Sequence, residues 1–391
     1  MNNFQYYVPT NVIFGRGTQS RVGALVKEAG GKKVLLHYGG KSAEASGLLD
    51  QIRASLREAG IEFVELGGVV PNPHLGKVYE GIDLCKREKV DFLLAVGGGS
   101  VIDSAKAISY GVANEGDVWR YYEGKGEVTA CVPVGVVLTI AAAGSETSSG
   151  SVITDERTGK KRSYGTNLSR PKFAIMNPEL TMTLPDYQTQ SGCVDMLMHT
   201  MERYFTNGGN MEITDSIAEG LMRTVMKYAK ILHNDPLNYD ARAEIMWAGS
   251  LAHNGLTGCG SIGDWSCHQL EHELGGLFDV THGAGLAAVW GSWARYVYKD
   301  CLYRFVRFAT NVMGVEKKES DEFTALAGIA AMEDFYRSIS MPTSLAELGI
   351  RPTGAQIGWM AESCFEACGG CQGSAKRLYL EDMRNIYINA K

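Results

Sequence analysis

The sequence has no apolar run long enough to cross a membrane and no excess of positive charge. Its 391 residues include 38 Lys and Arg against 44 Asp and Glu, a formal net charge of −6. A nucleic-acid-binding surface or a polybasic membrane patch needs the opposite balance. The first residues, MNNFQYYVPTNVIFG, lack the basic region and apolar region of a signal peptide. We therefore expect a protein with neither nucleic-acid nor membrane partners.

The cysteines do not form the pattern of a disulfide framework. There are nine, an odd number, and they are scattered along the chain. Together with the missing signal peptide, this predicts free thiols and a cytoplasmic protein. At 391 residues the chain is too long for one compact core, so two domains are expected.

Short apolar runs alternate with helical patterns in the first half of the chain. Strands are predicted over 32–38, 61–69, 91–100 and 132–140, and helices over 47–60, 75–90 and 100–112. A β-hairpin is predicted over 151–165. The alternation indicates a parallel sheet with helices on both faces. After residues 183–190 the apolar spacing is helical, over 213–233, 238–255 and 301–314, and no convincing strand follows. We place the boundary near Pro185, which gives an α/β domain over 1–185 and an all-helical domain over 186–391.

A glycine-rich loop, Gly97-Gly98-Gly99-Ser100, lies between a predicted strand and a predicted helix. Glycines let a phosphate approach the backbone, and a helix N-terminus offers free N–H groups. The loop does not have the G-x-G-x-x-G spacing, and the alternative is a tight strand-to-helix turn. Ser100 and Asp103 also fit a capping box, which is a structural role.

The segment after the first predicted strand bears on cofactor choice. Folds that select NAD place an acidic residue near this point to bind the ribose 2′-hydroxyl. Here the residues are Gly39, Gly40, Lys41 and Ser42, which include no acid. We therefore predict a preference for NADP. The alternative is that Lys41 is only a solvated surface lysine.

One aspartate and three of the eight histidines form a candidate metal site. Asp195 and His199 are four residues apart, so both side chains lie on one helix face. His268 and His282 would complete an N/O ligand set suited to zinc, iron(II) or manganese. Such Asp/His pairs also occur as ordinary helix contacts, but a second cluster, which includes His272, favours the metal hypothesis.

The chain resembles the iron-containing (group III) alcohol dehydrogenases, especially the branch of butanol dehydrogenases and broad aldehyde reductases. The motifs that carry the resemblance are PNP at 71–73, VGGGSVIDSAK at 96–106, GSE at 144–146, NPEL at 177–180, VDMLMH at 194–199 and HQLEH with HGAG within 268–285. The resemblance implies a Rossmann-like nucleotide-binding domain plus an all-α metal-binding domain, the architecture of dehydroquinate synthase.

The resemblance also implies roles for individual residues. It makes Asp195, His199, His268 and His282 ligands of one Fe²⁺ or Zn²⁺ ion, with His272 beside the metal and not a ligand. Asn72, residues 97–100 and Thr139 would line the nucleotide site, and Lys161 would lie near the nicotinamide. We also count Asp103, in the helix after the glycine loop, among the candidate cofactor-binding residues. We also expect a homodimer.

Two segments depart from the family pattern. Ala143 stands before GSE, where the family commonly has threonine, so one cofactor hydrogen bond is expected to be missing. Cys364, Cys368 and Cys371 have the spacing C-x3-C-x2-C, which is typical of iron–sulfur ligands. The alternative is three ordinary thiols, because a helical domain provides no matching fold.

The main hypothesis is an NAD(P)-linked oxidoreductase that interconverts small alcohols and aldehydes, with His272 relaying the proton. One rival is a lyase of the dehydroquinate synthase type. It would need a Lys and Arg cluster for a phosphorylated sugar acid, and residues 190–285 show none. The other rival is a non-catalytic nucleotide-binding sensor, which would have no need of a full ligand set.

Overall fold

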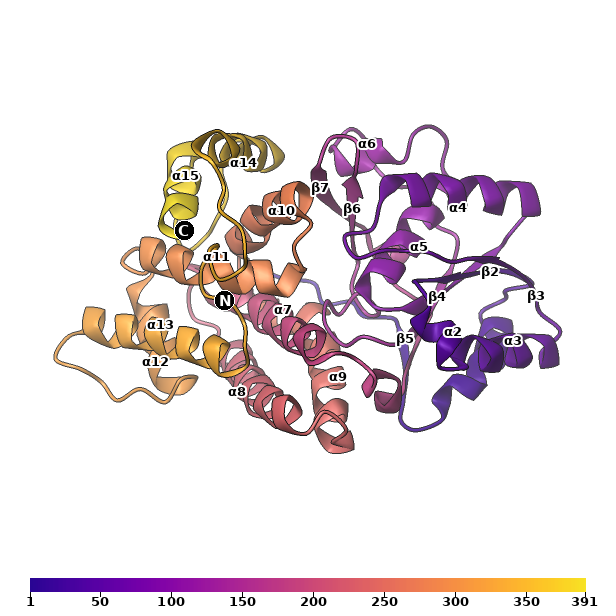
Figure 1. Ribbon diagram of the computed structural model, residues 1–391, viewed down its shortest axis with the longest axis horizontal. Helices are drawn as coiled ribbons and strands as arrows, with labels where there is room; N and C mark the ends of the chain where they lie inside the picture. The colour runs from indigo at the N-terminus through magenta and orange to yellow at the C-terminus, as the bar shows by residue number, and fades with distance from the viewer. The chain divides into compact units, whose positions relative to one another are not determined.

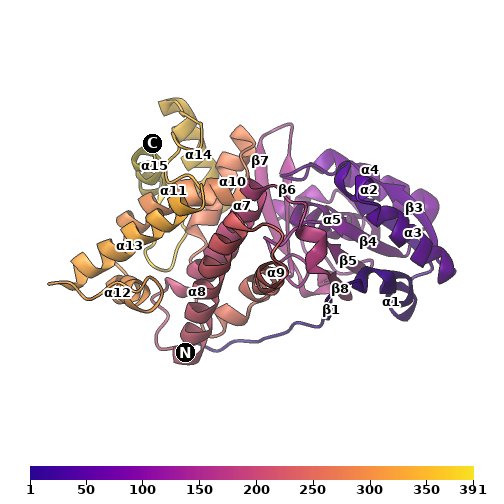
Figure 2. The same ribbon diagram turned by 60° about the horizontal axis from the view of Figure 1, so that its bottom comes forward.

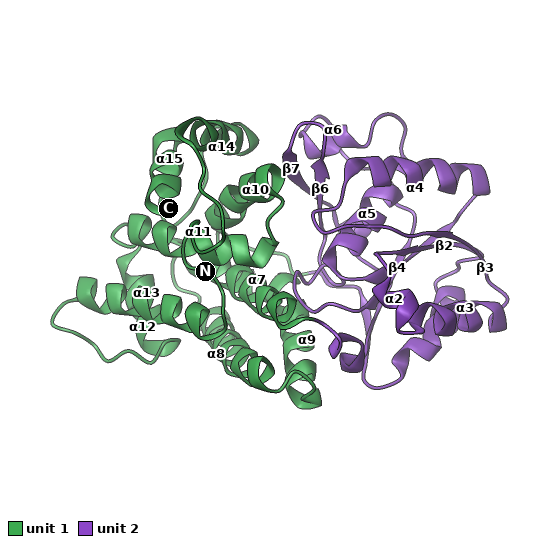
Figure 3. Cartoon of the chain, in the orientation of Figure 1, with its two compact units in different colours: residues 1–6, 185–391 green, residues 7–184 purple.

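The computed structural model describes all residues from Met1 to Lys391. The chain divides into two compact units (Figure 3): residues 7–184, and residues 1–6 together with 185–391. The first unit is built around a parallel sheet and the second is made of helices. No helix combines the length and the apolar character that a membrane span requires.

The sheet of the first unit has six parallel strands in the order β1-β8-β5-β4-β2-β3. The strands are β1 (Asn11–Phe14), β2 (Lys33–Tyr38), β3 (Glu62–Leu66), β4 (Phe92–Gly97), β5 (Val134–Leu138) and β8 (Phe173–Met176). Two further strands, β6 (Gly150–Asp155) and β7 (Lys160–Gly165), form an antiparallel hairpin. The central strands β4 and β5 are buried along their whole length, as parallel strands covered on both faces must be.

Helices cover both faces of this sheet (Figures 1 and 2). The helices of this unit are α1 (Val22–Glu28), α2 (Ser42–Ala45), α3 (Leu48–Glu58), α4 (Leu75–Glu88), α5 (Gly99–Ala113) and α6 (Trp119–Tyr122), of which α6 packs against β7 of the hairpin. Apolar side chains of α1 and α3 form one core with alternate residues of β2 and β4, among them Val34, Leu36, Leu94 and Val96. Figure 1 shows α4 and α5 on the opposite face.

The predicted parallel sheet, its helices and the 151–165 hairpin are confirmed. The prediction missed β1, β8, α1 and the four-residue helices α2 and α6. Each of the two strands has only four residues, NVIF and FAIM, and β1 lies at an edge of the sheet with two exposed positions. So short a run cannot show the alternation that distinguishes a strand from a loop.

The second unit contains nine α-helices and none of the strands β1 to β8. They are α7 (Asp186–Tyr204), α8 (Glu212–Asn234), α9 (Tyr239–His253), α10 (Ser266–Phe278), α11 (His282–Val297), α12 (Leu302–Asn311), α13 (Asp321–Ser338), α14 (Gly354–Ala367) and α15 (Leu380–Asn389). Helix α7 is buried at every position from Thr189 to Tyr204. A helix buried on all sides lies in the middle of its unit, so polar side chains on it face protein and not water.

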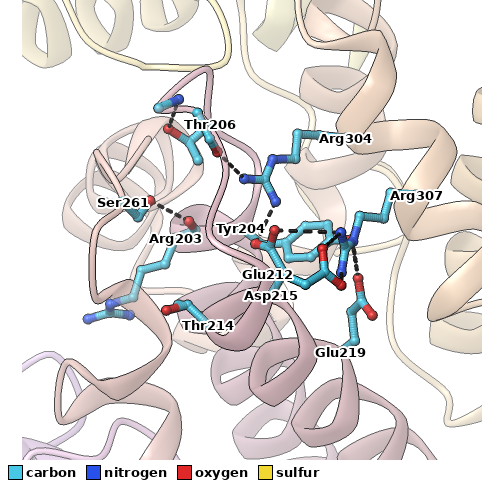
Figure 4. A network of polar contacts seen from close by, with 12 residues as sticks. Arg203, Tyr204, Thr206, Glu212, Thr214, Asp215, Glu219, Ser261, Arg304 and Arg307 are labelled. Atoms are coloured by element: carbon cyan, nitrogen blue, oxygen red, sulfur yellow. Dashed lines mark hydrogen bonds and ion pairs between the residues drawn. The ribbon is translucent and has the colours of Figure 1, made fainter. Parts of the chain in front are cut away.

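Arginines of α12 form ion pairs with carboxylates of α8, and Tyr204 of α7 joins the same network (Figure 4). Arg304 is 1% exposed, and its Nη1 lies 2.5 Å from Oδ1 of Asp215. Arg307 donates to Glu219 through Nε at 2.5 Å and to Glu212 through both terminal nitrogens at 2.7 and 2.8 Å. Tyr204, the last residue of α7, donates to the same Glu219 carboxylate at 2.9 Å. The network therefore fixes the C-terminal end of α7.

One histidine of the first unit is part of its core. His37 in β2 is completely buried, with Nδ1 2.8 Å from the carbonyl oxygen of Leu66 and Nε2 2.9 Å from Oγ of Ser104. Burial lowers the pKa of His37 to about 4. The imidazole is therefore neutral at pH 7 and serves as a bridge between β2, β3 and α5.

Candidate nucleotide and metal sites

The segments predicted to bind a nucleotide follow neighbouring strands. Residues 39–42 follow β2, residues 97–100 end β4 and begin α5, and Thr139 follows β5. These strands lie side by side in the order β5-β4-β2 and are parallel, so the three segments share one edge of the sheet. The chain runs outward from β2 to β3 and then crosses back to β4. Open α/β sheets bind ligands at the carboxyl ends of the strands where the strand order reverses in this way.

The turn after β4 has no room for side chains. A Cβ atom on Gly97 would lie 2.4 Å from Cγ2 of Val101, and one on Gly98 would lie 2.8 Å from Cβ of Ile140. Helix α5 begins at Gly99, and no side chain caps its N-terminus. The first N–H groups of α5 therefore have no side-chain acceptor, which is the arrangement that suits a phosphate.

The capping box considered for Ser100 and Asp103 is wrong. The Asp103 carboxylate accepts hydrogen bonds from Oγ of Ser145 at 2.6 Å and from the backbone N–H of Val152 at 3.0 Å. Lys106, also on α5 and completely buried, donates to the carbonyl oxygen and Oγ of Ser145 at 2.8 and 3.0 Å. Burial lowers the pKa of Lys106 to about 8. The two side chains thus fasten the GSE segment and the start of β6 to α5.

The other predicted nucleotide contacts lie in two environments. Asn72 is buried and has a positive φ of 52°. The next residue, Pro73, accepts a hydrogen bond from Thr154 of β6 at 2.9 Å, and Thr154 pairs with Lys161 across the hairpin. The structure therefore connects the hairpin that carries Lys161 to the 72–73 loop. Lys41, by contrast, is exposed at the start of α2.

Three helices bring the predicted metal ligands together. Asp195 and His199 lie on α7, His268 on α10, and His282 is the first residue of α11. Oδ1 of Asp195 lies 3.6 Å from Nδ1 of His199, 3.5 Å from Nε2 of His268 and 3.7 Å from Nε2 of His282. Two ligand atoms on a tetrahedral ion with bonds of about 2.1 Å are separated by roughly 3.4 Å. The spacing fits shared coordination better than direct hydrogen bonding.

The donor atoms of this cluster fit a divalent cation. Ligand atoms of Asp195, His268 and His282 all lie within 4.8 Å of one another. His199 is next to Asp195 but outside this group of three, and its ring stacks on those of His268 and His253. Oδ1 of Asp195, Nδ1 of His199 and Nε2 of His268 are buried without a hydrogen-bond partner. Buried polar atoms are almost always paired, so three unsatisfied donors at one point favour a bound cation.

Burial also sets the protonation of one candidate ligand. It lowers the pKa of His199 well below the usual histidine value, and the neighbouring histidines and Arg203 add to the effect. A neutral imidazole has the lone pair that a metal requires.

Two carboxylates beside the cluster were not predicted. Glu202 of α7 accepts a hydrogen bond from Nδ1 of His268, and Glu271 of α10 accepts one from Nδ1 of His282. Both glutamate side chains are completely buried. A signal existed in their spacing: Glu202 follows His199 by three residues, and Glu271 follows His268 by three, so each shares a helix face with a candidate ligand.

The sequence of each unit matches a known family. The family model of the iron-containing alcohol dehydrogenases matches residues 9–178. The model of the C-terminal part of the Fe-containing alcohol dehydrogenase family matches residues 189–390. The chain belongs to the iron-containing alcohol dehydrogenases.

Relatives of this iron-containing alcohol dehydrogenase match over nearly their whole length. The NADH-dependent butanol dehydrogenase A of Clostridium acetobutylicum is 38% identical over 388 residues, 99% of each chain. The NADPH-dependent aldehyde reductase YqhD of Escherichia coli is 36% identical over 395 residues, 100% of each chain. The crystal structure of NADH-dependent butanol dehydrogenase A from Thermotoga maritima has a TM-score of 0.96 at 40% identity and covers 100% of this chain and 99% of that one.

His272 lies beside the candidate ligands in this family member. It is buried on α10, and its ring centroid is 6.4 Å from that of His268 and 6.0 Å from that of His282. It is not in the group of three whose donor atoms converge. His199 is outside that group as well, so this grouping does not by itself distinguish a ligand from a neighbouring residue, and the non-ligand role of His272 stays a prediction.

The glycines of the HGAG motif allow α11 to approach its neighbours. A Cβ atom on Gly283 would lie 1.9 Å from the carbonyl oxygen of Ser191 in α7. One on Gly285 would lie 2.9 Å from Cγ of Glu271 in α10. Because His282 directly precedes Gly283, this close packing determines where the His282 imidazole lies.

The two departures from the family pattern have structural explanations. The Cβ atom of Ala143 lies 3.0 Å from the place that a Cβ on Gly99 would occupy, so the small residue packs against the glycine loop. Cys364, Cys368 and Cys371 form no disulfide, and they do not form a ligand group. The end of their segment is held instead by Asp264, which accepts the backbone N–H groups of residues 374 and 375 at 2.7 and 2.9 Å.

Proposed function

We propose that this family member is a metal-dependent, NAD(P)-linked oxidoreductase that reduces small aldehydes to alcohols, preferentially with NADPH. The observation that carries the proposal is the buried cluster of Asp195, His199 and His268, whose donor atoms converge without hydrogen-bond partners. A single cation at this point would satisfy all three atoms at once.

Asp195, His199, His268 and His282 would hold one Fe²⁺ or Zn²⁺ ion. One carboxylate and three imidazoles suit either ion, and the choice depends on availability as well as affinity. When bound, the cation supplies Lewis acidity toward a carbonyl oxygen, and the nicotinamide supplies or accepts a hydride. The protein's own contribution is to place and orient these groups and to manage the proton.

The remaining predicted residues would bind the cofactor, position the binding segments or transfer the proton. The backbone of residues 97–100 would bind the pyrophosphate, with Asn72, Thr139 and Lys161 along the rest of the nucleotide. Asp103 and Lys106 act indirectly, because they hold the segment at 145–152 against α5. His272 would give a proton to the alcohol oxygen as it forms, directly or through one water molecule.

The preference for NADPH rests on the segment after β2. Gly39, Gly40, Lys41 and Ser42 include no carboxylate that would repel a 2′-phosphate, and the exposed Lys41 could attract one. The relatives include enzymes described as NADH-dependent and one described as NADPH-dependent. The preference therefore has to be measured on this chain.

We also propose that the protein works as a cytoplasmic homodimer. None of the nine cysteines forms a disulfide, which suits a reducing compartment. Strand β1 pairs only with β8, so one of its edges is available, and Phe14 on it is 40% exposed. Such an edge is a place where a second chain can add. Size-exclusion chromatography with light scattering would give the mass.

A combined metal and turnover experiment tests the proposal. The purified protein would be analysed for Fe, Zn and Mn and assayed with a panel of aldehydes, using NADH and NADPH in parallel. His268→Ala removes a proposed ligand. The matched control is His233→Ala, which removes a half-buried histidine of α8 that pairs with Asp186 at the first position of α7. We expect only His268→Ala to lose metal and turnover together.

Two outcomes would overturn the proposal. A protein that contains metal but turns over no aldehyde or alcohol with either cofactor would favour the sensor or lyase alternatives. Full metal content and activity in His268→Ala would show that the ligand assignment is wrong.

A further inference from the structure

The two buried glutamates next to the candidate metal site have the same geometric relation to their histidines. In each pair the carboxylate contacts Nδ1, while Nε2 of the same ring lies within 3.7 Å of Oδ1 of Asp195. A carboxylate can only accept, so the proton of each neutral imidazole must be on Nδ1. The lone pair of Nε2 is then directed at the point where the ligands converge.

We propose that Glu202 and Glu271 are positioning residues that orient His268 and His282 and fix their tautomers for metal binding. The inference shares one assumption with the proposed function, which is that a cation binds at this site. It concerns how the chain builds that site and not which substrate the enzyme uses.

Burial supports this assignment. Neither glutamate side chain is exposed at all. An ionised carboxylate is costly to bury unless it is paired and hydrogen-bonded. The contacts to His268 and His282 provide that pairing, and a nearby cation would balance the charge. Partners of this kind occur on most metal-bound histidines and strengthen the ligand.

Glu202 has a second contact that holds the ligand's backbone. Its Oε1 accepts the backbone N–H of His268 at 3.1 Å, and His268 is the third residue of α10. The first N–H groups of a helix have no partner within it, and its N-terminus favours negative charge. Glu202 therefore fixes both the start of α10 and the ring of His268.

The pairs form a chain across the three helices that carry the ligands. Helix α7 provides Asp195 and the carboxylate that orients the ligand on α10. Helix α10 in turn provides the carboxylate that orients the ligand on α11. Helices α10 and α11 are thus each held in register by a carboxylate of the preceding ligand-carrying helix.

Metal affinity of the apo-protein tests the proposal without any need for turnover. Glu202→Gln and Glu271→Gln keep the side-chain shape but remove the charge, and they replace a group that can only accept with an amide that can also donate. Loss of such a partner weakens metal binding by about 10- to 100-fold. We expect about 10-fold weaker Zn²⁺ binding for each variant, measured by competition with a chromophoric chelator, and roughly 100-fold for the double variant.

The control is Glu273→Gln. Glu273 is also buried on α10, two residues beyond Glu271, which places it on the other side of the helix. It tests whether loss of any buried carboxylate from α10 weakens metal binding. The visible spectrum of the Co²⁺-substituted protein provides a second readout, because ligand-field bands respond to ligand geometry. We expect those bands to change in the two site variants and to stay as in wild type in Glu273→Gln.

The outcomes separate this inference from the proposed function. Zn²⁺ binding by Glu202→Gln and Glu271→Gln as tight as by wild type, or weakened no more than by Glu273→Gln, would overturn the inference. If one variant does not fold, the other tests the same idea on a different ligand. Wild-type protein that binds Zn²⁺ but does not reduce aldehydes would refute the proposed function and leave the inference standing.

Discussion

Substitution of Gly283 by alanine is the most direct test of how the helices hold the candidate metal site. The added Cβ atom would lie 1.9 Å from the carbonyl oxygen of Ser191, 2.6 Å from its carbonyl carbon and 2.9 Å from its Cα atom. All three are backbone atoms of α7, so no side chain can rotate away. The closest comfortable C···O contact is about 3.3 Å, so α11 and α7 must separate by roughly 1.4 Å.

That displacement has two measurable consequences. Overpacking of a core costs about 1–3 kcal/mol, and a contact with backbone belongs at the upper end. At about 2–4 °C per kcal/mol, we expect the melting temperature to fall by roughly 6–12 °C. Metal ligands tolerate shifts of only about 0.2 Å, so the neighbouring His282 should leave the site and Zn²⁺ affinity should fall together with stability.

Gly358→Ala is the matched control in the same helical unit. Gly358 lies inside α14, and nothing is within 4 Å of a Cβ atom placed there. Alanine in a helix interior is better than glycine by about 0.5–1 kcal/mol, so this variant should melt slightly higher than wild type. Differential scanning fluorimetry of both apo variants, with chelator competition for Zn²⁺, gives the comparison. A Gly283→Ala protein with wild-type stability and affinity would refute the helix packing described above.

Three further predictions concern other sites. His272→Phe should retain the metal and lower the rate of aldehyde reduction, because a proton relay is not a ligand; loss of metal on this change would make His272 a ligand instead. Gly39→Asp should shift kcat/KM from NADPH toward NADH by repelling the 2′-phosphate, and a parent enzyme that already prefers NADH would contradict the reasoning. His37 has its pKa lowered to about 4 in the folded chain, against a usual 6.5, so the unfolded chain binds more protons between these values. The stability of wild type should therefore fall as the pH drops from 6.5 to 4, and His37→Gln should lose that part of the slope in urea titrations at a series of pH values.

The spacing of residues within a single helix or strand was enough to predict the elements themselves and the residues that share one face of them. The alternation of apolar runs and amphipathic segments predicted the parallel sheet. Elements such as β2, β4 and α5 are 6 to 15 residues long, which is enough for their own apolar pattern to identify them. The four-residue step from Asp195 to His199 placed both on one face of α7 for the same reason. The family motifs, which occur across most of the chain, then predicted which distant residues belong to the same site.

Features that depend on contacts between distant residues could not be predicted in this way. Glu202 and His268 are 66 residues apart, and nothing in either helix alone shows that they meet. Asp103 was expected to act at the start of its own helix, but its carboxylate binds residues 42 and 49 positions further on. A short polar side chain fits several local motifs equally well, and tertiary packing decides among them.

The first six residues, which pack with the helical unit, have a consequence for synthesis. Asn2 hydrogen-bonds to the carbonyl oxygens of Gly208 and Gly260, which lie 206 and 258 positions later in the chain. At about 5–20 residues per second, the ribosome needs roughly 10–50 s to deliver the second partner. During that interval the whole of 7–184 can emerge and fold as a contiguous unit, while Gly260 has not yet been made. The N-terminal segment is thus made before residues 7–184 but can dock only after them, and until then it is open to capture by a chaperone.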